Sequence, residues 1–184
     1  MNIGFDLDKI FIDYPPLIPD VLIDRLYKKK SNGTLAYRFP SPLEQRIRKL
    51  SHYPFFRPAI KQNIAFLKSI KREKNKLYLV SSRFGFLEYE TATIIKKLGL
   101  DKIFDGVYFN YDNKQPHEFK STVIQTLKLD IYIDDDFPLL KYIAKHNKKT
   151  QFFWLTKKRS HEKLTRNITA ISNLSEIFSK YDIT

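Results

Sequence analysis

The chain of 184 residues contains no cysteine. This absence rules out disulfide bonds, thiolate zinc sites and cysteine nucleophiles. The sequence also lacks a run of about 18 apolar residues of the kind that crosses a membrane, and its N-terminus has no charged segment followed by an apolar one. Repeats and low-complexity tracts are missing as well. We therefore expect a cytoplasmic protein that does not associate with membranes.

Negative charge is scarce, because 20 acidic residues stand against 33 lysines and arginines and the net charge is +13. Such an excess attracts nucleic-acid phosphates when it gathers on one face. Here it is spread over four short runs, at residues 28–30, 71–76, 145–149 and 157–159. Each run falls where a helix should end or a loop should pass, and the helix dipole favours cations near helix C-termini. A solvated basic surface is the favoured interpretation, with a polyanionic substrate as the alternative.

The apolar share of 42% is well above that of a disordered chain. A chain of this length suits one domain and is long enough to bury about 70% of its unfolded surface on folding. Apolar runs typical of strands alternate with apolar stripes at helical spacing. The expected strands cover residues 3–8, 77–80, 105–110, 130–133 and 151–155, and the expected helices cover 58–70, 87–98, 116–127 and 138–146. Gly99 is expected to end the helix over 87–98. This alternation predicts an α/β fold, a Rossmann-like three-layer sandwich with a mostly parallel sheet.

Residues 14–57 break this alternation. Pro19 could open a short helix through residue 27, and residues 31–34 have the composition of a loop. Ser41 is an expected N-cap, followed by Pro42 at the first helical position and Glu44 three residues after the cap. We therefore predict a small helical cap insertion over residues 14–57, with residues 1–13 and 58–184 forming the core domain.

The segment after residue 162 has a weaker pattern. Ile171, Leu174, Ile177 and Phe178 are spaced as one apolar face of a helix. Such a face is more often part of a core than of an interface.

Two carboxylates, Asp6 and Asp8, come at the end of the first predicted strand. Residues two apart in an extended strand point to the same side, and open α/β sheets bind ligands at the C-terminal edge of their strands. Two carboxylates so close repel each other unless a cation or a shared proton stabilises them. The pattern predicts a divalent-metal site or an acid/base pair.

Three further motifs follow in order at strand ends or helix starts. Together with the first they read IGFDLDKI, LYLVSSR, HEFK and IYIDDD, and they place Ser81, Lys120, Asp134 and Asp135 beside Asp6 and Asp8 as candidate site residues. This series resembles the haloacid dehalogenase-like hydrolase superfamily, in which an apolar strand with DxD is followed by a strand with Ser or Thr, a lysine, and a strand with acidic residues. The linking stretch LGLDKIFDGVYF is also similar, and the resemblance spans residues 2–155. Lys114 is the alternative to Lys120.

The resemblance implies catalytic roles for four residues. Asp6 is the expected nucleophile that forms an aspartyl-phosphate, and Asp8 is the expected general acid and base. Ser81 and Lys120 are expected to bind the phosphoryl group and to offset its charge.

The resemblance also implies a Mg²⁺ site. Asp6, the main-chain carbonyl of Asp8 and Asp134 are the expected direct ligands, and Asp135 is expected to act through metal-bound water. Asp136 is interpreted as a cap or surface residue. Lys9 stands where the superfamily often has glycine, so a cation beside the metal could alter phosphate binding.

These inferences favour a Mg²⁺-dependent phosphatase that hydrolyses phosphomonoesters of a small metabolite, with nucleotides among the candidates. The presence of Asp8 argues against a true dehalogenase, which needs no acid for an alkoxide. The insertion supplies candidate contacts for phosphate or sugar groups: Arg38, Arg46, Arg48, His52 and Arg57. Two alternatives stay open: a phosphatase acting on nucleic-acid ends or phosphoproteins, if the basic runs share the face of the site, and a non-catalytic binding module, against which the intact motifs argue.

Overall fold

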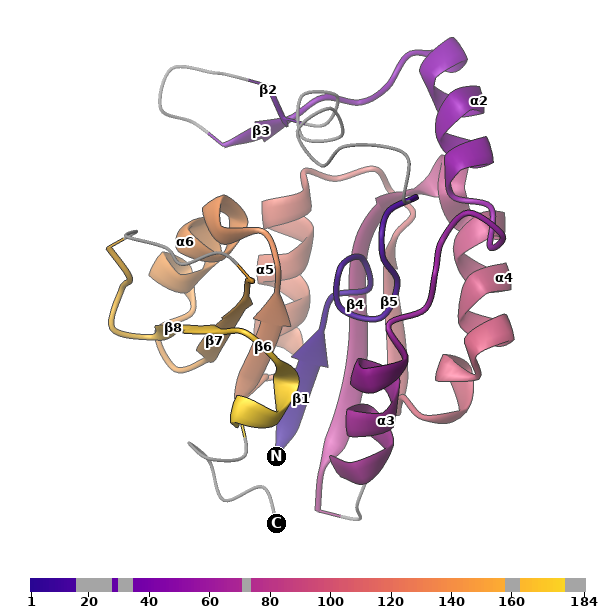
Figure 1. Cartoon of the computed structure of the whole chain (residues 1–184). Coiled ribbons are helices and arrows are strands. Elements are labelled where there is room, and N and C mark those ends of the chain that lie inside the picture. The colour runs from indigo at the N-terminus through magenta and orange to yellow at the C-terminus, as the bar shows by residue number, and fades with distance from the viewer. Residues whose placement is uncertain (16–27, 30–34, 71–73, 158–162, 178–184) are drawn as a thin grey trace.

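The computed structural model describes residues 1–15, 28–29, 35–70, 74–157 and 163–177 (Figure 1). A six-stranded sheet forms its centre, in the order β5-β4-β1-β6-β7-β8, and every neighbouring pair of strands is parallel. The strands are β1 (Asn2–Phe5), β4 (Lys76–Phe84), β5 (Gly106–Asn110), β6 (Ile131–Asp134), β7 (Gln151–Leu155) and β8 (Ile168–Ile171). The α/β class and the parallel sheet are therefore confirmed.

Alternating side chains of the central strands enter two separate apolar clusters, one on each face of the sheet. Ile131 and Ile133 of β6 pack into the first cluster, whereas Tyr132 between them packs into the second. This follows from the two-residue period of a strand, and it explains why β6 is apolar at every position before its acidic end.

Helices cover both faces of the sheet, as expected for parallel strands joined by crossovers (Figure 1). Residues of α3 (Lys61–Ile70) and α4 (Glu88–Leu98) pack into the first cluster, and residues of α5 (Pro116–Thr126) and α6 (Phe137–His146) pack into the second. Gly99 ends α4 in the left-handed conformation, with φ of 65°, as the sequence predicts.

The insertion lies beyond the C-terminal ends of the strands (Figure 1). It contains α2 (Pro42–Ser51), which begins with the predicted capping box between Ser41 and Glu44. It also contains a two-stranded antiparallel pair, β2 (Lys28–Lys29) and β3 (Ala36–Tyr37), which the sequence analysis did not predict. The helix expected over residues 19–27 and the loop over 31–34 lie outside the described residues.

Helix α2 exposes its apolar side chains and buries a charged one, unlike an ordinary surface helix. Its apolar side chains Leu43, Ile47 and Leu50 are 61–69% exposed, whereas Arg48 is only 4% exposed. Surface helices normally bury the apolar stripe and expose the charged one.

The expected helical face near the C-terminus is wrong in its secondary structure. Ile171 ends strand β8, and Leu174 begins the 3-10 helix η3 (Leu174–Ile177). Pairing of β8 with the edge of β7 outweighs the helical spacing, because backbone hydrogen bonds to β7 are available only in the folded sheet. The expectation that Ile171, Leu174 and Ile177 belong to the core is confirmed, and Phe178 lies outside the described residues.

Within the part of the chain that the structure describes, no helix is both long enough and apolar enough to span a bilayer.

Gly4 in the central strand β1 leaves no room for a side chain. A Cβ atom at this position would lie 2.4 Å from Leu129 Cδ1 and 2.9 Å from Tyr132 Cδ2, and both neighbours are buried. We expect Gly4→Ala to lower the free energy of unfolding by about 1–3 kcal/mol, as overpacking of a core does. Urea unfolding followed by circular dichroism measures this, and an unchanged midpoint would contradict the close packing described.

Candidate active site

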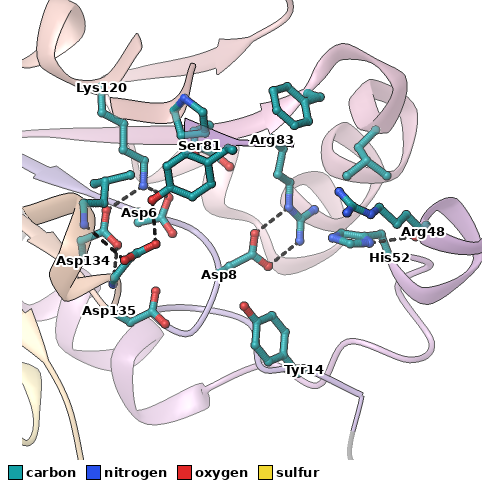
Figure 2. Close-up of a pocket in the computed structure, with 17 residues that line it drawn as sticks. Asp6, Asp8, Tyr14, Arg48, His52, Ser81, Arg83, Lys120, Asp134 and Asp135 are labelled. Carbon is teal, nitrogen blue, oxygen red and sulfur yellow. Dashed lines mark hydrogen bonds and ion pairs between the residues drawn. The ribbon is translucent and has the colours of Figure 1, made fainter. Parts of the chain in front are cut away.

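A cavity of about 130 Å³ opens at the C-terminal edge of the sheet, and it is lined by residues of the strand ends and of the insertion. Among its lining residues are all six side chains that the sequence analysis selected: Asp6, Asp8, Ser81, Lys120, Asp134 and Asp135. They come from the segment after β1, from the C-terminal half of β4, from the end of β6 and from α5 (Figure 2). Strand ends far apart in sequence meet here because parallel strands share one C-terminal edge.

Three carboxylates form an acidic cluster on one side of the cavity. Asp6, Asp134 and Asp135 each offer an oxygen, and these oxygens all lie within 4.8 Å of one another. Asp6 follows β1 directly, and its backbone N–H donates to the carbonyl oxygen of Ile133, 2.9 Å away. This bond continues the pairing of β1 with β6 and so holds the three carboxylates together.

Lys120 bridges two members of this cluster. Its Nζ donates to Asp6 Oδ1 at 2.9 Å and to Asp134 Oδ2 at 2.6 Å, and its side chain is buried. Lys114, the alternative lysine, is exposed and lies 3.5 Å from Asp112. Of the two candidates, Lys120 is therefore the one that the structure brings to the acidic cluster.

The protonation of these groups reflects burial and mutual repulsion. Burial raises the pKa of Asp6 to about 7, although the positive charge of Lys120 opposes this rise. Burial, together with the charges of Asp134 and Asp6, raises the pKa of Asp135 well above its ordinary value. Burial alone would lower the pKa of Lys120, but Asp134 and Asp6 outweigh it and raise that pKa, so the ammonium group stays charged.

The acidic cluster fits a divalent cation. Its carboxylates are oxygen donors, the ligands that Mg²⁺ prefers, and their oxygens lie within 4.8 Å of one another, close enough to share one ion. The residues that could hold the ion are Asp6, Asp134 and Asp135. The expected contribution of the Asp8 carbonyl stays a prediction.

Neighbouring hydrogen bonds orient Asp134. Its Oδ2 accepts from the Tyr132 hydroxyl at 3.1 Å, and its Oδ1 accepts from the backbone N–H of Asp136 at 2.9 Å. Asp136 itself caps α6 by accepting from the backbone N–H of Leu139, in agreement with the interpretation of this residue as a cap. Its other oxygen accepts from the hydroxyl of Tyr37. This hydrogen bond connects strand β3 of the insertion to the core.

Ser81 is buried inside β4, which continues to Phe84 instead of ending near Val80 as expected. The register between β4 and β5 shifts between Ser81 and Phe84. This irregularity lies at the cavity, which Ser81, Ser82 and Arg83 all line.

Asp8 lines the same cavity, but its carboxylate is held by two guanidinium groups. Arg83 donates to both oxygens, from Nε at 2.8 Å and from Nη2 at 2.7 Å, and Arg57 donates to Oδ1. Burial would raise the pKa of Asp8, but Arg83 and Arg57 outweigh it and hold that pKa far below its ordinary value. Asp8 is thus ionised and directed away from the acidic cluster (Figure 2).

The role of Arg83 was missed by the sequence analysis. Arg83 stands two residues after Ser81 in an extended segment, so the two side chains are expected on the same side of β4. That spacing was the available signal, but it does not identify Asp8 as the partner, because 75 residues separate the two.

Lys9 does not join the site. Its backbone has a φ of 60°, the left-handed conformation that glycine adopts readily. Its Nζ lies 2.9 Å from Asp13 Oδ1 and 4.2 Å from the centre of the Tyr14 ring, and Lys9 is not among the cavity-lining residues. The expectation of a cation beside the metal is therefore not met in this structure.

The five candidate contacts of the insertion separate into three groups. Arg48 and His52 of the α2 region line the cavity, and Arg57 reaches Asp8. Arg38 pairs with Glu44 and Arg46 is exposed, and neither of them lines the cavity.

The sequence matches no protein-family model and no curated protein. Solved structures do match over nearly the whole chain. A Thermotoga maritima protein assigned as a β-phosphoglucomutase is 16% identical, with a TM-score of 0.66 over 97% of both chains. A haloacid dehalogenase-like family hydrolase from Streptococcus pneumoniae is also 16% identical, with a TM-score of 0.59 over 98% of both chains.

A third similar structure holds ligands. A HAD family enzyme from Bacteroides thetaiotaomicron, solved in complex with magnesium and inorganic phosphate, is 16% identical, with a TM-score of 0.54 over 87% of this chain and 96% of that chain. At these identities the likeness concerns the fold. The chain has the haloacid dehalogenase-like fold, as the sequence motifs predicted.

Proposed function

We propose that the protein is a Mg²⁺-dependent phosphomonoester hydrolase that forms an aspartyl-phosphate on Asp6. One observation carries the proposal: Lys120 bridges Asp6 and Asp134 inside a buried acidic cluster that adjoins Ser81 at the C-terminal edge of the sheet. Such a cluster is costly for folding alone, because buried like charges repel and lose their hydration. Phosphoryl transfer gives it a chemical use.

In the first step, a carboxylate oxygen of Asp6 forms a bond to phosphorus while the bond from phosphorus to the ester oxygen breaks. Asp8 is ionised while Arg57 and Arg83 hold it, so the proposal requires it to take up a proton from solvent as substrate binding displaces part of that contact. The departing oxygen then takes this proton from Asp8, so that an alcohol leaves. Lys120 offsets the negative charge of the phosphoryl oxygens, and the Ser81 hydroxyl donates a hydrogen bond to one of them.

In the second step, a water oxygen forms a bond to phosphorus, Asp8 accepts a proton from that water, and the bond between phosphorus and Asp6 breaks. Inorganic phosphate leaves and Asp6 is again a carboxylate. Because the Asp8 carboxylate faces Arg57 and Arg83 in the structure, the proposal requires it to exchange part of this contact for the leaving group when substrate binds.

Mg²⁺ held by Asp6, Asp134 and Asp135 would neutralise charge between the nucleophile and the incoming phosphate. The Bacteroides relative, which was solved with magnesium and inorganic phosphate, supports this choice of ion and ligand.

The substrate is proposed to be small. Tyr37 of the insertion is hydrogen-bonded to the core at two points beside the site, from its N–H to Gln115 Oε1 at 2.9 Å and from its hydroxyl to Asp136 at 2.9 Å. Among the described parts of the four basic runs, residues 74–76 and 145–149 precede β4 and β7 and so lie toward the opposite edge of the sheet, whereas Lys28–Lys29 form β2 of the insertion and Lys157 follows β7 on the site side. The contacts of Tyr37 with the core beside the site therefore support a small phosphate ester, and the basic runs do not decide against a nucleic-acid end.

Metal removal tests the proposed function. We expect the wild type to hydrolyse p-nitrophenyl phosphate with Mg²⁺, and the rate to fall by about 100-fold or more with chelator, because the ion stabilises several kcal/mol of transition-state charge. Addition of Mg²⁺ should restore the rate and raise the melting temperature, since a ligand of the folded state stabilises it. Hydrolysis that proceeds equally with chelator, or release of halide from a 2-haloacid instead of phosphate from the ester, would contradict the proposal.

A further inference from the structure

Among the residues that the structure describes, three donors reach the carboxylate of Asp134. Lys120 Nζ at 2.6 Å and the Tyr132 hydroxyl at 3.1 Å both donate to Oδ2, whereas the backbone N–H of Asp136 donates to Oδ1 at 2.9 Å. Each oxygen of a carboxylate has about two acceptor sites. Within the described part of the chain, the sites of Oδ2 are therefore filled and one site of Oδ1 stays open.

The Tyr132 hydroxyl is held beside Asp134 by packing and by the strand. Tyr132 is fully buried in the second apolar cluster, and its ring lies so close to Gly4 that a Cβ atom there would be 2.9 Å from Tyr132 Cδ2. Tyr132 precedes Asp134 by two residues on β6, so both side chains leave the same side of the strand. The hydroxyl has one hydrogen, and Asp134 Oδ2 at 3.1 Å is nearer than the carbonyl oxygen of Val80 at 3.4 Å.

The number of oxygens that a carboxylate can offer separates two common divalent cations. Mg²⁺ binds about six ligands in a near-octahedral arrangement and keeps several waters, so one oxygen from each carboxylate is enough. Ca²⁺ is larger, takes about six to eight oxygens and often binds both oxygens of one carboxylate. A carboxylate with one oxygen engaged by two donors therefore suits Mg²⁺ better than Ca²⁺.

We propose that Tyr132 is a positioning residue that makes the site prefer Mg²⁺ to Ca²⁺. Its hydroxyl donates to Oδ2 beside Lys120 and so leaves Asp134 a single oxygen, Oδ1, for a cation. The inference rests on the proposed function in one respect, that the acidic cluster holds a divalent cation. Tyr132 does not touch the cation and acts through Asp134.

Tyr132→Phe is the variant that tests this role. Phenylalanine keeps the ring in the apolar cluster and removes only the hydroxyl, so one acceptor site of Asp134 Oδ2 opens. Lys120 is unsuitable for the test because it also donates to Asp6, the proposed nucleophile. Tyr78→Phe is the matched control, because Tyr78 packs against the same cluster from β4 and does not line the cavity.

Trp154 supplies a reporter of cation binding that does not depend on activity. It is the single tryptophan of the chain, and its Nε1 donates to the backbone carbonyl oxygen of Asp135 at 2.9 Å. A cation held by the acidic cluster should therefore change the fluorescence of Trp154. Titration of chelator-treated protein with magnesium chloride and with calcium chloride, followed by this fluorescence and by calorimetry, gives the Kd of each cation.

We expect wild-type protein to bind Mg²⁺ more tightly than Ca²⁺. In Tyr132→Phe the ratio of the Ca²⁺ Kd to the Mg²⁺ Kd should fall by about 10-fold, the size typical of one hydrogen bond to a charged group. The fall should come mainly from tighter Ca²⁺ binding, because Ca²⁺ gains access to Oδ2. Tyr78→Phe should keep the wild-type ratio, and the melting temperature with chelator shows whether each variant is folded.

Three results would overturn this role of Tyr132. The first is wild-type protein that binds neither cation or binds Ca²⁺ at least as tightly as Mg²⁺, a comparison that needs no variant. The second is an unchanged ratio in folded Tyr132→Phe. The third is an equal weakening of both cations in that variant, which is what a purely structural role of the hydroxyl predicts.

Failure of the proposed function looks different. The wild type would then bind Mg²⁺ without hydrolysing p-nitrophenyl phosphate, and the two Kd values would still decide the role of Tyr132. Conversely, Mg²⁺-dependent hydrolysis by the wild type together with an unchanged ratio in Tyr132→Phe would support the proposed function and reject this role.

Discussion

Asp6→Asn should abolish phosphoester hydrolysis, with kcat reduced by at least about 10⁴-fold, because loss of a covalent nucleophile is among the largest single effects in enzymes. The fold should tolerate the change. Asparagine keeps the shape of aspartate, and the pKa of Asp6, raised to about 7 by burial, means that the native side chain is already partly neutral at neutral pH. We expect the free energy of unfolding measured with chelator to change by no more than about 1 kcal/mol.

Initial rates with p-nitrophenyl phosphate and Mg²⁺ measure the effect of Asp6→Asn. Asp112→Asn is the matched control, because the Asp112 side chain is 78% exposed. This variant should retain full activity. Asparagine can deamidate back to aspartate, so Asp6→Ala is the second variant and should be as inactive. More than about a tenth of wild-type activity in Asp6→Ala would show that Asp6 is not the nucleophile.

Lys120→Met should damage both activity and stability. The substitution removes the ammonium group that donates to Asp6 at 2.9 Å and to Asp134 at 2.6 Å, and it leaves their carboxylates buried without that partner. Breaking one side of a buried ion pair typically costs about 3–5 kcal/mol. We expect a loss of about 3 kcal/mol in the free energy of unfolding with chelator, and a fall of at least about 10³-fold in kcat/KM, the size seen when charge stabilisation of a transition state is lost.

Urea unfolding with chelator and with Mg²⁺ separates the two effects of Lys120→Met. Added Mg²⁺ should recover part of the lost stability, because the carboxylates of the acidic cluster remain available to it. Lys114→Met is the control, since Lys114 is 57% exposed and lies outside the cavity. A larger loss of activity in Lys114→Met than in Lys120→Met would reverse the assignment of the phosphate-binding lysine.

The comparison of Lys120 with Lys114 shows what a sequence pattern can predict and what it cannot. The sequence placed both near the start of one helix, but in the structure Lys120 shares the buried face of α5 with Pro116, Val123 and Ile124. Their spacing of three and four residues is visible in the sequence and is a further reason for Lys120, which the sequence analysis already favoured over Lys114. What the sequence could not supply is the reason for burying a lysine, because its partners Asp6 and Asp134 are 114 and 14 residues away.

Local signals were most reliable where neighbouring residues decide the structure. The capping box of α2 and the left-handed Gly99 after α4 were predicted because the hydrogen bonds or backbone angles concerned involve a few adjacent positions. Local signals gave the wrong prediction for β8: Ile171 was expected on a helix, but pairing with β7 decides its conformation. The β2 and β3 pair in the insertion was missed for a related reason, since two-residue strands carry almost no pattern of their own.

The sequence by itself determined the alternation of apolar strands and amphipathic helices, and with it the parallel sheet and the acidic residues at its C-terminal edge. These features depend on periodicity and on motif order, which the chain carries locally. Only the tertiary structure decided how the charges pair: Lys120 with the acidic cluster, Arg57 and Arg83 with Asp8, and Arg48 buried against the cavity. Charge pairing depends on distance and burial in three dimensions, and neither is written in the spacing of residues along the chain.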